Sequence, residues 1–209
     1  MILIGQYDSP FVRRVAVTLQ LYQLGYEHRP WSAVGDADKI GEVNPLMRVP
    51  TLITSEGEAF TDSGAIIQLL DHQAGFGAFL SRNWPQQGEV LRLTAFAAGV
   101  AEKAVALLYE KAFHEGIVPA WHGRLIRQVT DTLAMLDRER AASKTPWLFG
   151  ERLSHADIMI GTTFCFLREA LAGQVSLDSY KALRKHSRAC DALPEFKKAY
   201  QPFALAGAD

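Results

Sequence analysis

The serine at position 9 stands where a side chain could act on an anion. The apolar residues at the start of the chain predict a short buried strand over residues 2–5, which glycine, aspartate and proline then break. An apolar stripe at helical spacing predicts a helix over residues 10–24, with Pro10 at its first position and Ser9 as its N-cap. Because a helix N-terminus offers unpaired N–H groups and attracts anions, the Ser9 hydroxyl could hydrogen-bond a thiolate or a carboxylate.

Two later segments place further polar groups at the ends of predicted elements. Residues 44–52 read NPLMRVPTL, which puts Pro50 directly before a strand-like run. Residues 60–66 read FTDSGAI, which puts Asp62 and Ser63 at the start of another predicted helix. The chain therefore offers a second helix N-terminus for an anion, and a proline that fixes the backbone before a strand.

In this order, the motifs S-P-F-x-x-R-V, N-P-x-x-x-V-P-x-L and D-S-x-A-I-x-x-L-L resemble the glutathione S-transferase family. Their spacing matches the N-terminal domain of that family across the first 75 residues. The S-P-F form most resembles the serine-type members, including the plant tau class. The resemblance implies a thioredoxin-like first domain, glutathione as co-substrate with no metal, and a homodimer.

Ionising the glutathione thiol is the chemical task that this resemblance implies for Ser9. A free cysteine thiol has a pKa of about 8.5, and its thiolate is the nucleophile. Each unit of pKa lowering needs about 1.4 kcal/mol, while a hydrogen bond to a charged group supplies about 1.5–3 kcal/mol and a helix terminus up to about 2 kcal/mol. Ser9 is the predicted catalytic residue, and Tyr7, two residues earlier, is the alternative. An ordinary N-cap role would also account for Ser9.

Five residues are expected to hold glutathione. The resemblance implies a cis bond before Pro50, which would let the Val49 backbone pair with the cysteinyl part of the ligand. Ser63 is expected to bind the γ-glutamyl carboxylate and Asp62 the γ-glutamyl ammonium. Family members often carry glutamate where this chain has Asp62, and a simple helix cap is the alternative role there. Arg48 could bind the glycyl carboxylate or face solvent.

A small apolar electrophile is expected in a pocket between the two domains. The candidate lining residues are aromatic, although aromatic side chains at helical spacing usually belong to ordinary core. They are Phe11, Tyr109, Phe113 and Phe166.

Several other side chains have ordinary structural interpretations. Arg13 and Arg14 are expected in salt bridges at a domain interface or on the surface, and His155 is expected to be exposed. Cys165 and Cys190 lie far apart without metal-ligand spacing, and are expected to be small buried hydrophobes.

The order of elements predicts an α+β fold in two domains, of residues 1–75 and 85–209. The first alternates, with a strand–helix–strand start that implies a parallel pair and a hairpin that adds an antiparallel pair. This βαβαββα order matches the thioredoxin-like domain that the resemblance implies. Its strands are predicted at 2–5, 27–31, 51–54 and 58–60, and its helices at 10–24, 36–43 and 62–73. After a linker at 74–84, an all-α bundle is predicted with helices at 86–114, 118–142, 154–172, 177–190 and 193–201.

The start of one bundle helix carries a sharp local signal. Residues 153–158 read LSHADI, in which Ser154 and Asp157 are spaced for a capping box and Leu153 and Ile158 for a hydrophobic staple. This segment is expected to serve folding and not chemistry.

Composition limits the class of protein. The 209 residues carry a formal net charge of −1, which disfavours nucleic acid as a partner. No apolar run approaches the roughly 20 residues that span a bilayer, and no signal peptide is apparent, so a cytoplasmic protein is expected. A glutathione transferase is the predicted function. The alternatives are a glutathione-dependent isomerase, dehalogenase or peroxidase, and a non-catalytic interaction protein like the bacterial stringent-starvation proteins, which bind RNA polymerase.

Overall fold

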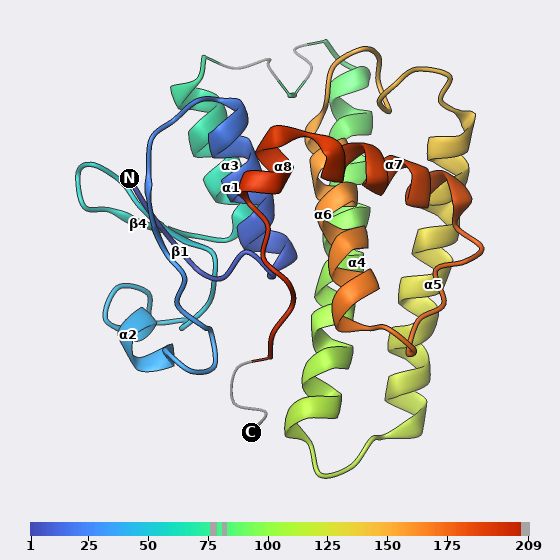
Figure 1. The fold of residues 1–209 in the computed structure, drawn as a ribbon, viewed down its shortest axis with the longest axis horizontal. Coiled ribbons are helices and arrows are strands. Elements are labelled where there is room, and N and C mark those ends of the chain that lie inside the picture. Colours follow the sequence, from blue (N-terminus) through green and yellow to red (C-terminus); the bar gives the residue numbers. More distant parts are fainter. Residues whose placement is uncertain (76–78, 81–82, 206–209) are drawn as a thin grey trace. The chain divides into compact units, whose positions relative to one another are not determined.

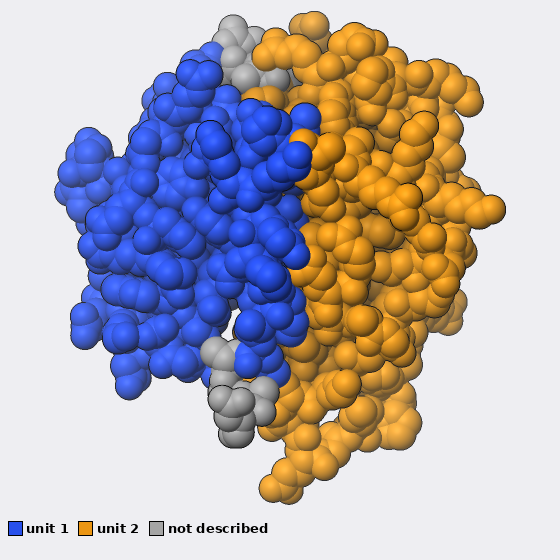
Figure 2. Space-filling view, in the orientation of Figure 1, with its two compact units in different colours: residues 1–78, 193–209 blue, residues 79–192 orange. Residues whose placement is uncertain are grey.

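The computed structural model describes residues 1–75, 79–80 and 83–205. The chain divides into two compact units, coloured separately in Figure 2. Unit 1 combines Met1–Ala78 with Leu193–Asp209, and unit 2 is Phe79–Ala192. The end of the chain thus groups in space with the beginning, whereas the sequence analysis assigned it to the helical domain.

Unit 1 is built on a mixed four-stranded sheet, as predicted (Figure 1). The strand order is β2-β1-β3-β4. The β1–β2 pair is parallel, and the β1–β3 and β3–β4 pairs are antiparallel. The strands are β1 (Ile2–Ile4), β2 (Glu27–Arg29), β3 (Thr51–Ile53) and β4 (Ala59–Thr61).

In unit 1, α1 (Pro10–Leu21) packs against both α3 (Ser63–Gln73) and α8 (Pro194–Lys198). The short α2 (Ala37–Gly41) lies between β2 and β3 in the sequence. Most of α1 is buried, including side chains on several sides of the helix. A helix covered this completely can direct polar residues toward the interior as well as apolar ones.

Unit 2 is helical, as predicted, and α6 lies at its centre. Its helices are α4 (Gln86–Phe113), α5 (Pro119–Ala142), α6 (His155–Ala170) and α7 (Lys181–Ala192). The helix α6 packs against α4 and α7, and α5 packs against the same two neighbours. In the part of the chain that the structure describes, no helix has the length and apolar character to cross a membrane.

The predicted capping box at the start of α6 is confirmed. The Ser154 hydroxyl accepts from the Asp157 N–H at 3.4 Å, and the Asp157 carboxylate accepts from the Ser154 N–H at 2.8 Å. The same carboxylate, which is fully buried, also accepts from the Leu148 N–H at 2.9 Å. The expectation that His155 is exposed is wrong, since only 4% of it is accessible. Position 155 is the first residue of a helix buried on every side, and its ring packs edge-on to Phe79.

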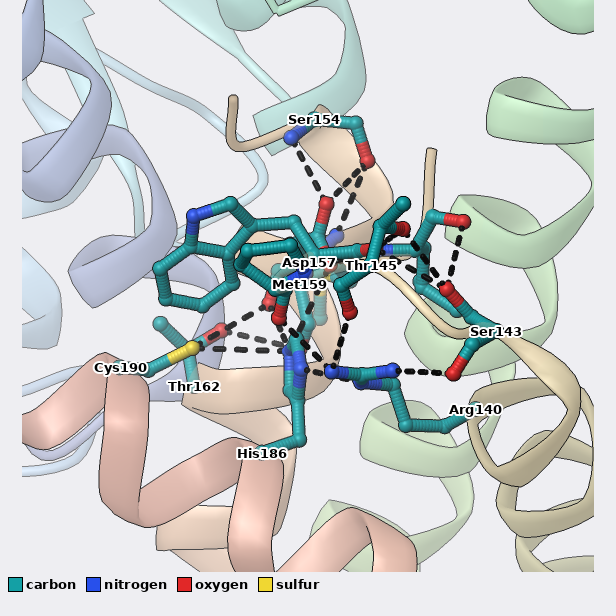
Figure 3. Close-up of polar contacts among 12 residues, drawn as sticks. Arg140, Ser143, Thr145, Ser154, Asp157, Met159, Thr162, His186 and Cys190 are labelled. Atoms are coloured by element: carbon teal, nitrogen blue, oxygen red, sulfur yellow. Dashed lines mark hydrogen bonds and ion pairs between the residues drawn. The ribbon is translucent and has the colours of Figure 1, made fainter. Parts of the chain in front are cut away.

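A buried histidine joins α5, α6 and α7 beneath this box (Figure 3). Arg140 donates from Nε to His186 Nδ1 at 3.2 Å. Since an arginine can only donate, His186 Nδ1 must be unprotonated, and its Nε2–H then donates to the Asp157 carbonyl at 3.2 Å. Burial lowers the pKa of His186, the nearby Asp157 raises it, and Arg140 lowers it. The imidazole is therefore a neutral structural link.

Candidate functional site

Ser9 caps α1 and keeps its own proton available. Its backbone is extended, and its Oγ accepts from the Val12 N–H at 3.4 Å. Within the described ranges, no group accepts a hydrogen bond from the Ser9 hydroxyl. The N-cap role and the predicted catalytic role are thus compatible, because the cap uses an oxygen lone pair and an anion would use the proton.

Tyr7 points its hydroxyl at a different part of unit 1. The Tyr7 and Tyr26 hydroxyl oxygens lie 2.8 Å apart, and Gln20 donates to Tyr26 at 3.3 Å. The Tyr7 ring stacks on His28 with 3.9 Å between centroids. Burial, with the Tyr26 hydrogen bond next, raises the pKa of Tyr7 far above its ordinary value.

These residues line a cavity of about 680 Å³ beside the C-terminal half of α1, and Glu195 and Lys198 of α8 line it as well. Gln20 lies 11 positions beyond Ser9, which is about 16 Å along a helix. The Tyr7 hydroxyl is therefore engaged away from the helix N-terminus that Ser9 caps.

The C-terminal segment holds the turn that carries Ser9. The Tyr7 N–H donates to Gln201 Oε1 at 3.0 Å, and the Ala204 N–H donates to an Asp8 carboxylate oxygen at 3.2 Å. Two adjacent residues of the turn, Tyr7 and Asp8, therefore contact a segment almost 200 positions away in the sequence. Sequence reasoning did not find Gln201, because no local pattern links it to the turn.

Arg13 of α1 contacts the same C-terminal segment. It is 4% exposed, and its Nη2 donates to the Phe196 carbonyl at 3.3 Å. Its guanidinium lies over the rings of Phe196 and Tyr200, 5.8 and 5.2 Å from their centroids. The expectation that Arg13 could lie on the surface is wrong, because α8 packs on the face of α1 that carries it.

The loop before β3 brings Val49 close to the start of α1. The Val49–Pro50 bond is cis, as the family resemblance implied. Gly5, with φ +130°, allows the close approach, since a Cβ there would lie 2.8 Å from the Val49 Cβ and 2.5 Å from Val12. The N–H and C=O of Val49 have no hydrogen-bond partner among the described residues, and are available to a strand-like ligand.

Asn44 braces this loop from inside. Its amide nitrogen donates to the Arg48 carbonyl at 3.1 Å and to the Thr51 and Thr61 hydroxyls at 2.9 and 3.2 Å. Asn44 itself is 4% exposed. The predicted ligand residue Arg48 is exposed, on a loop fixed at its backbone.

The N-terminus of α3 holds Asp62 and Ser63 in distinct roles. Asp62 is the N-cap: its Oδ1 accepts from the Gly64 and Ala65 N–H groups at 2.8 and 3.1 Å. Its φ of +69° is unusual for aspartate, and such strained positions gather at functional sites. The N–H and O–H of Ser63 have no acceptor in the part of the chain that is described, so both can donate to an anion.

Arg14 is the site residue that sequence reasoning missed. It is 5% exposed and lies behind α3, with Nη1 donating to Ser63 Oγ at 3.2 Å. Burial lowers the pKa of Arg14 to about 10, against the opposing effect of Asp62 and Asp71, so it remains a cation at neutral pH. Its place in the S-P-F-x-x-R-V motif was the available signal, and a domain-interface or surface salt bridge was the wrong interpretation.

The predicted electrophile residues lie on separate elements. Phe11 is in the first turn of α1 in unit 1, and Phe166 is 5% exposed in the core of unit 2. Tyr109 and Phe113, near the end of α4, are partly exposed and pack edge to face, with centroids 5.3 Å apart. A pocket that joins Phe11 to Tyr109 and Phe113 stays a prediction. No cluster of three or more His, Cys, Asp or Glu side chains within the described ranges could hold a metal ion.

The structure brings several predicted residues to the start of α1. Ser9 caps this helix, Val49 approaches it beside Gly5, and Ser63 is tied to it through Arg14. The arrangement offers a hydroxyl donor, an unpaired stretch of backbone and a second helix N-terminus. An anionic peptide could meet all three.

Two family models match the chain. They are the glutathione S-transferase N-terminal domain over residues 3–79 and the glutathione S-transferase C-terminal domain over residues 119–189. The uncharacterized GST-like protein YibF of Escherichia coli is 30% identical over 112 residues, 54% of this chain and 55% of that protein. Maleylacetoacetate isomerase of Pseudomonas aeruginosa is 27% identical over 205 residues, 93% of this chain and 92% of that protein. The chain thus spans about half of the first relative and nearly all of the second.

Among solved structures, the chain is similar to a glutathione S-transferase from Methylobacillus flagellatus with GSH bound. The TM-score is 0.86 at 26% identity, and the match covers 95% of this chain and 98% of that one.

Proposed function

The chain belongs to the glutathione S-transferase family, and we propose from this premise that it is a serine-type glutathione transferase. It binds glutathione on unit 1, ionises the thiol, and adds the thiolate to a small apolar electrophile. The observation that carries the proposal is the Ser9 hydroxyl at the N-terminus of α1, whose oxygen serves as the cap while its proton stays available.

Each predicted contact has a place in this binding mode. The thiolate accepts from Ser9, and the partial positive charge of the α1 terminus adds to its stabilisation. The backbone of Val49, the residue before Pro50, pairs with the cysteinyl residue of glutathione. Ser63 donates its N–H and O–H to the γ-glutamyl carboxylate, Asp62 offers its remaining carboxylate oxygen to the ammonium, and Arg48 faces the glycyl carboxylate.

The chemistry needs no general base on the enzyme. The bound thiol loses its proton to solvent because the anion is stabilised, and the sulfur lone pair then forms the new S–C bond. In a substitution the leaving group departs with the electron pair of the broken bond. In an addition the carbon that gains charge is protonated from solvent. Phe11, Tyr109 and Phe113 are the proposed electrophile contacts.

Titration of bound glutathione tests the role of Ser9 directly. We expect thiolate absorbance to give a bound pKa below about 8.5 in the wild type. Ser9→Ala should return the pKa toward that value with little loss of glutathione affinity. Tyr7→Phe is the matched variant, because it removes a neighbouring hydroxyl that is bonded to Tyr26. If Tyr7→Phe raises the thiol pKa and Ser9→Ala does not, the two roles are reversed.

A glutathione-dependent isomerase is the second candidate. The maleylacetoacetate isomerase of Pseudomonas aeruginosa is similar over almost the whole chain, which favours this alternative over dehalogenase or peroxidase activity. An isomerase regenerates glutathione, whereas a transferase consumes it. Measuring free thiol during turnover of maleylacetoacetate and of an activated aryl halide separates the two. Binding to glutathione without turnover of any electrophile would favour a non-catalytic protein.

A further inference from the structure

The buried guanidinium of Arg14 contacts the proposed carboxylate site at Ser63 and determines where the Ser63 hydroxyl proton can point. Arg14 reaches across from α1 and donates to Ser63 Oγ at 3.2 Å. Both residues are buried, with 5% of Arg14 and 4% of Ser63 exposed. Arginine has no acceptor atom, so the Ser63 oxygen must be the acceptor in this contact.

That contact determines the direction in which the Ser63 hydroxyl can donate a hydrogen bond. A hydroxyl has one proton, and with its oxygen facing Arg14 the proton must point elsewhere. No described group accepts it, and the neighbouring Ser63 N–H at the first position of α3 is likewise unengaged. Two donors therefore stand together at the start of α3.

We infer that Arg14 is a positioning residue that fixes the Ser63 hydroxyl as a donor and thereby makes the start of α3 selective for a carboxylate. The inference rests on the proposed function, since it takes the γ-glutamyl carboxylate as the anion. Arg14 does not touch the ligand. It acts through Ser63 and adds a positive charge behind the anion.

The surroundings of Arg14 support this role over a purely structural one. Its Nε is buried and has no hydrogen-bond partner among the described residues. Of the carboxylates that influence it, Asp62 is engaged as the α3 cap, while the buried Asp71 accepts a hydrogen bond from Tyr22. A cation beneath an anion site gives that burial a function.

Comparing the binding of two peptides distinguishes a specific effect on carboxylate recognition from a general loss of binding or folding. Glutathione is compared with 4-aminobutyryl-cysteinyl-glycine, which keeps the ammonium and the thiol but lacks the γ-glutamyl carboxylate. The proteins are the wild type, Arg14→Met, Ser63→Ala and the double variant. Arg13→Met is the matched control, because it removes an equally buried guanidinium of α1 that contacts Phe196 and not Ser63.

Calorimetry should show glutathione affinity reduced about tenfold or more in both single variants, as expected for a charge-assisted contact. The double variant should lose little more than either single one, because the two residues act through one hydroxyl. Affinity for the analogue should be the same in all of these proteins. Arg13→Met should leave the ratio of the two affinities unchanged.

The outcomes distinguish a failure of the proposed role of Arg14 from a failure of the carboxylate-site assignment at Ser63. If Ser63→Ala weakens glutathione selectively and Arg14→Met does not, the role of Arg14 is refuted while the carboxylate site stands. If wild-type protein binds both peptides equally, the site assignment itself fails. Should Arg14→Met not fold, Arg14→Lys replaces it, since an ammonium can still donate to Ser63. Lysine should retain part of the selectivity, and complete loss in a folded Arg14→Lys protein would contradict the inference.

Discussion

Two serines at helix N-termini show how one side chain can serve two purposes. Ser9 accepts from a backbone N–H of its own helix, and Ser63 accepts from a guanidinium of another helix. In both, the oxygen performs the structural task and leaves the proton for an anion. The difference is that Ser9 needs only local sequence, whereas Ser63 needs α1 and α3 to be packed together.

His186 should make the stability of unit 2 sensitive to mild acid. Its folded pKa is lowered, so below about pH 6.5 the unfolded chain binds protons that the folded chain does not. Stability contributed by the neutral imidazole is therefore complete above about pH 6.5. It is lost as the pH falls from there toward the folded pKa, by up to about 1.4 kcal/mol per pH unit.

Urea unfolding between pH 7.5 and 5.0 measures this effect. His186→Gln, which cannot titrate, is the control. It should lower the free energy of unfolding at pH 7.5 and show a smaller decrease on acidification than the wild type. Parallel pH profiles for the two proteins would show that His186 is not the titrating group.

At the scale of elements, the start of α6 is the most sensitive helix terminus in unit 2. Asp157→Ala removes the acceptor for the Ser154 and Leu148 N–H groups, both within a buried site. Each of these two buried donors costs about 1–3 kcal/mol when it is left unsatisfied. We therefore expect a loss of about 2–6 kcal/mol in the free energy of unfolding.

Ser154→Ala is the comparison for this prediction. It removes the hydroxyl contacts but leaves the Asp157 carboxylate bound to both N–H groups, and should cost about 1 kcal/mol. Denaturant unfolding gives both values. Equal losses in the two variants would mean that the carboxylate does no more than a standard cap.

The short helix α8 should stabilise unit 1 out of proportion to its five residues. Phe196 is fully buried, and its carbonyl accepts from Arg13. Phe196→Ala should cost about 3–5 kcal/mol, as for other buried aromatic residues. Hydrogen exchange in α1 should accelerate as α8 detaches, while exchange in α5 should not. The reverse pattern would show that α8 stabilises unit 2.

At the scale of the whole molecule, we predict a homodimer in which unit 1 of one subunit meets unit 2 of the other. Family membership is the main reason for this prediction. The half-exposed Phe96 on α4 is an apolar side chain of unit 2 that a partner could cover. Sedimentation at micromolar concentration should show a dimer that Phe96→Glu weakens. A wild-type monomer would contradict the prediction.

The sequence predicted features that depend on local order better than those that depend on distant contacts. The N-cap at Ser9, the hairpin before β4 and the capping box at Ser154 each depend on a few neighbouring residues. The buried positions of Arg13 and Arg14 escaped prediction because helical spacing describes α1 alone and not α3 and α8, which cover it. Gln201 escaped for the same reason, since its partner Tyr7 lies at the other end of the chain.

Unit 1 is discontinuous, and this has a consequence for its synthesis. A ribosome delivers the sheet and α1–α3 first, then all of unit 2, and only afterwards the residues of α8. Domains generally fold as units during translation, beginning from the N-terminus. Here the turn that carries Ser9 lacks Gln201 until that late segment emerges, so nascent unit 1 spends most of translation as an incomplete structure. Until then the face of α1 that carries Arg13 lacks its α8 cover, and the helical unit is complete before the unit that was begun first.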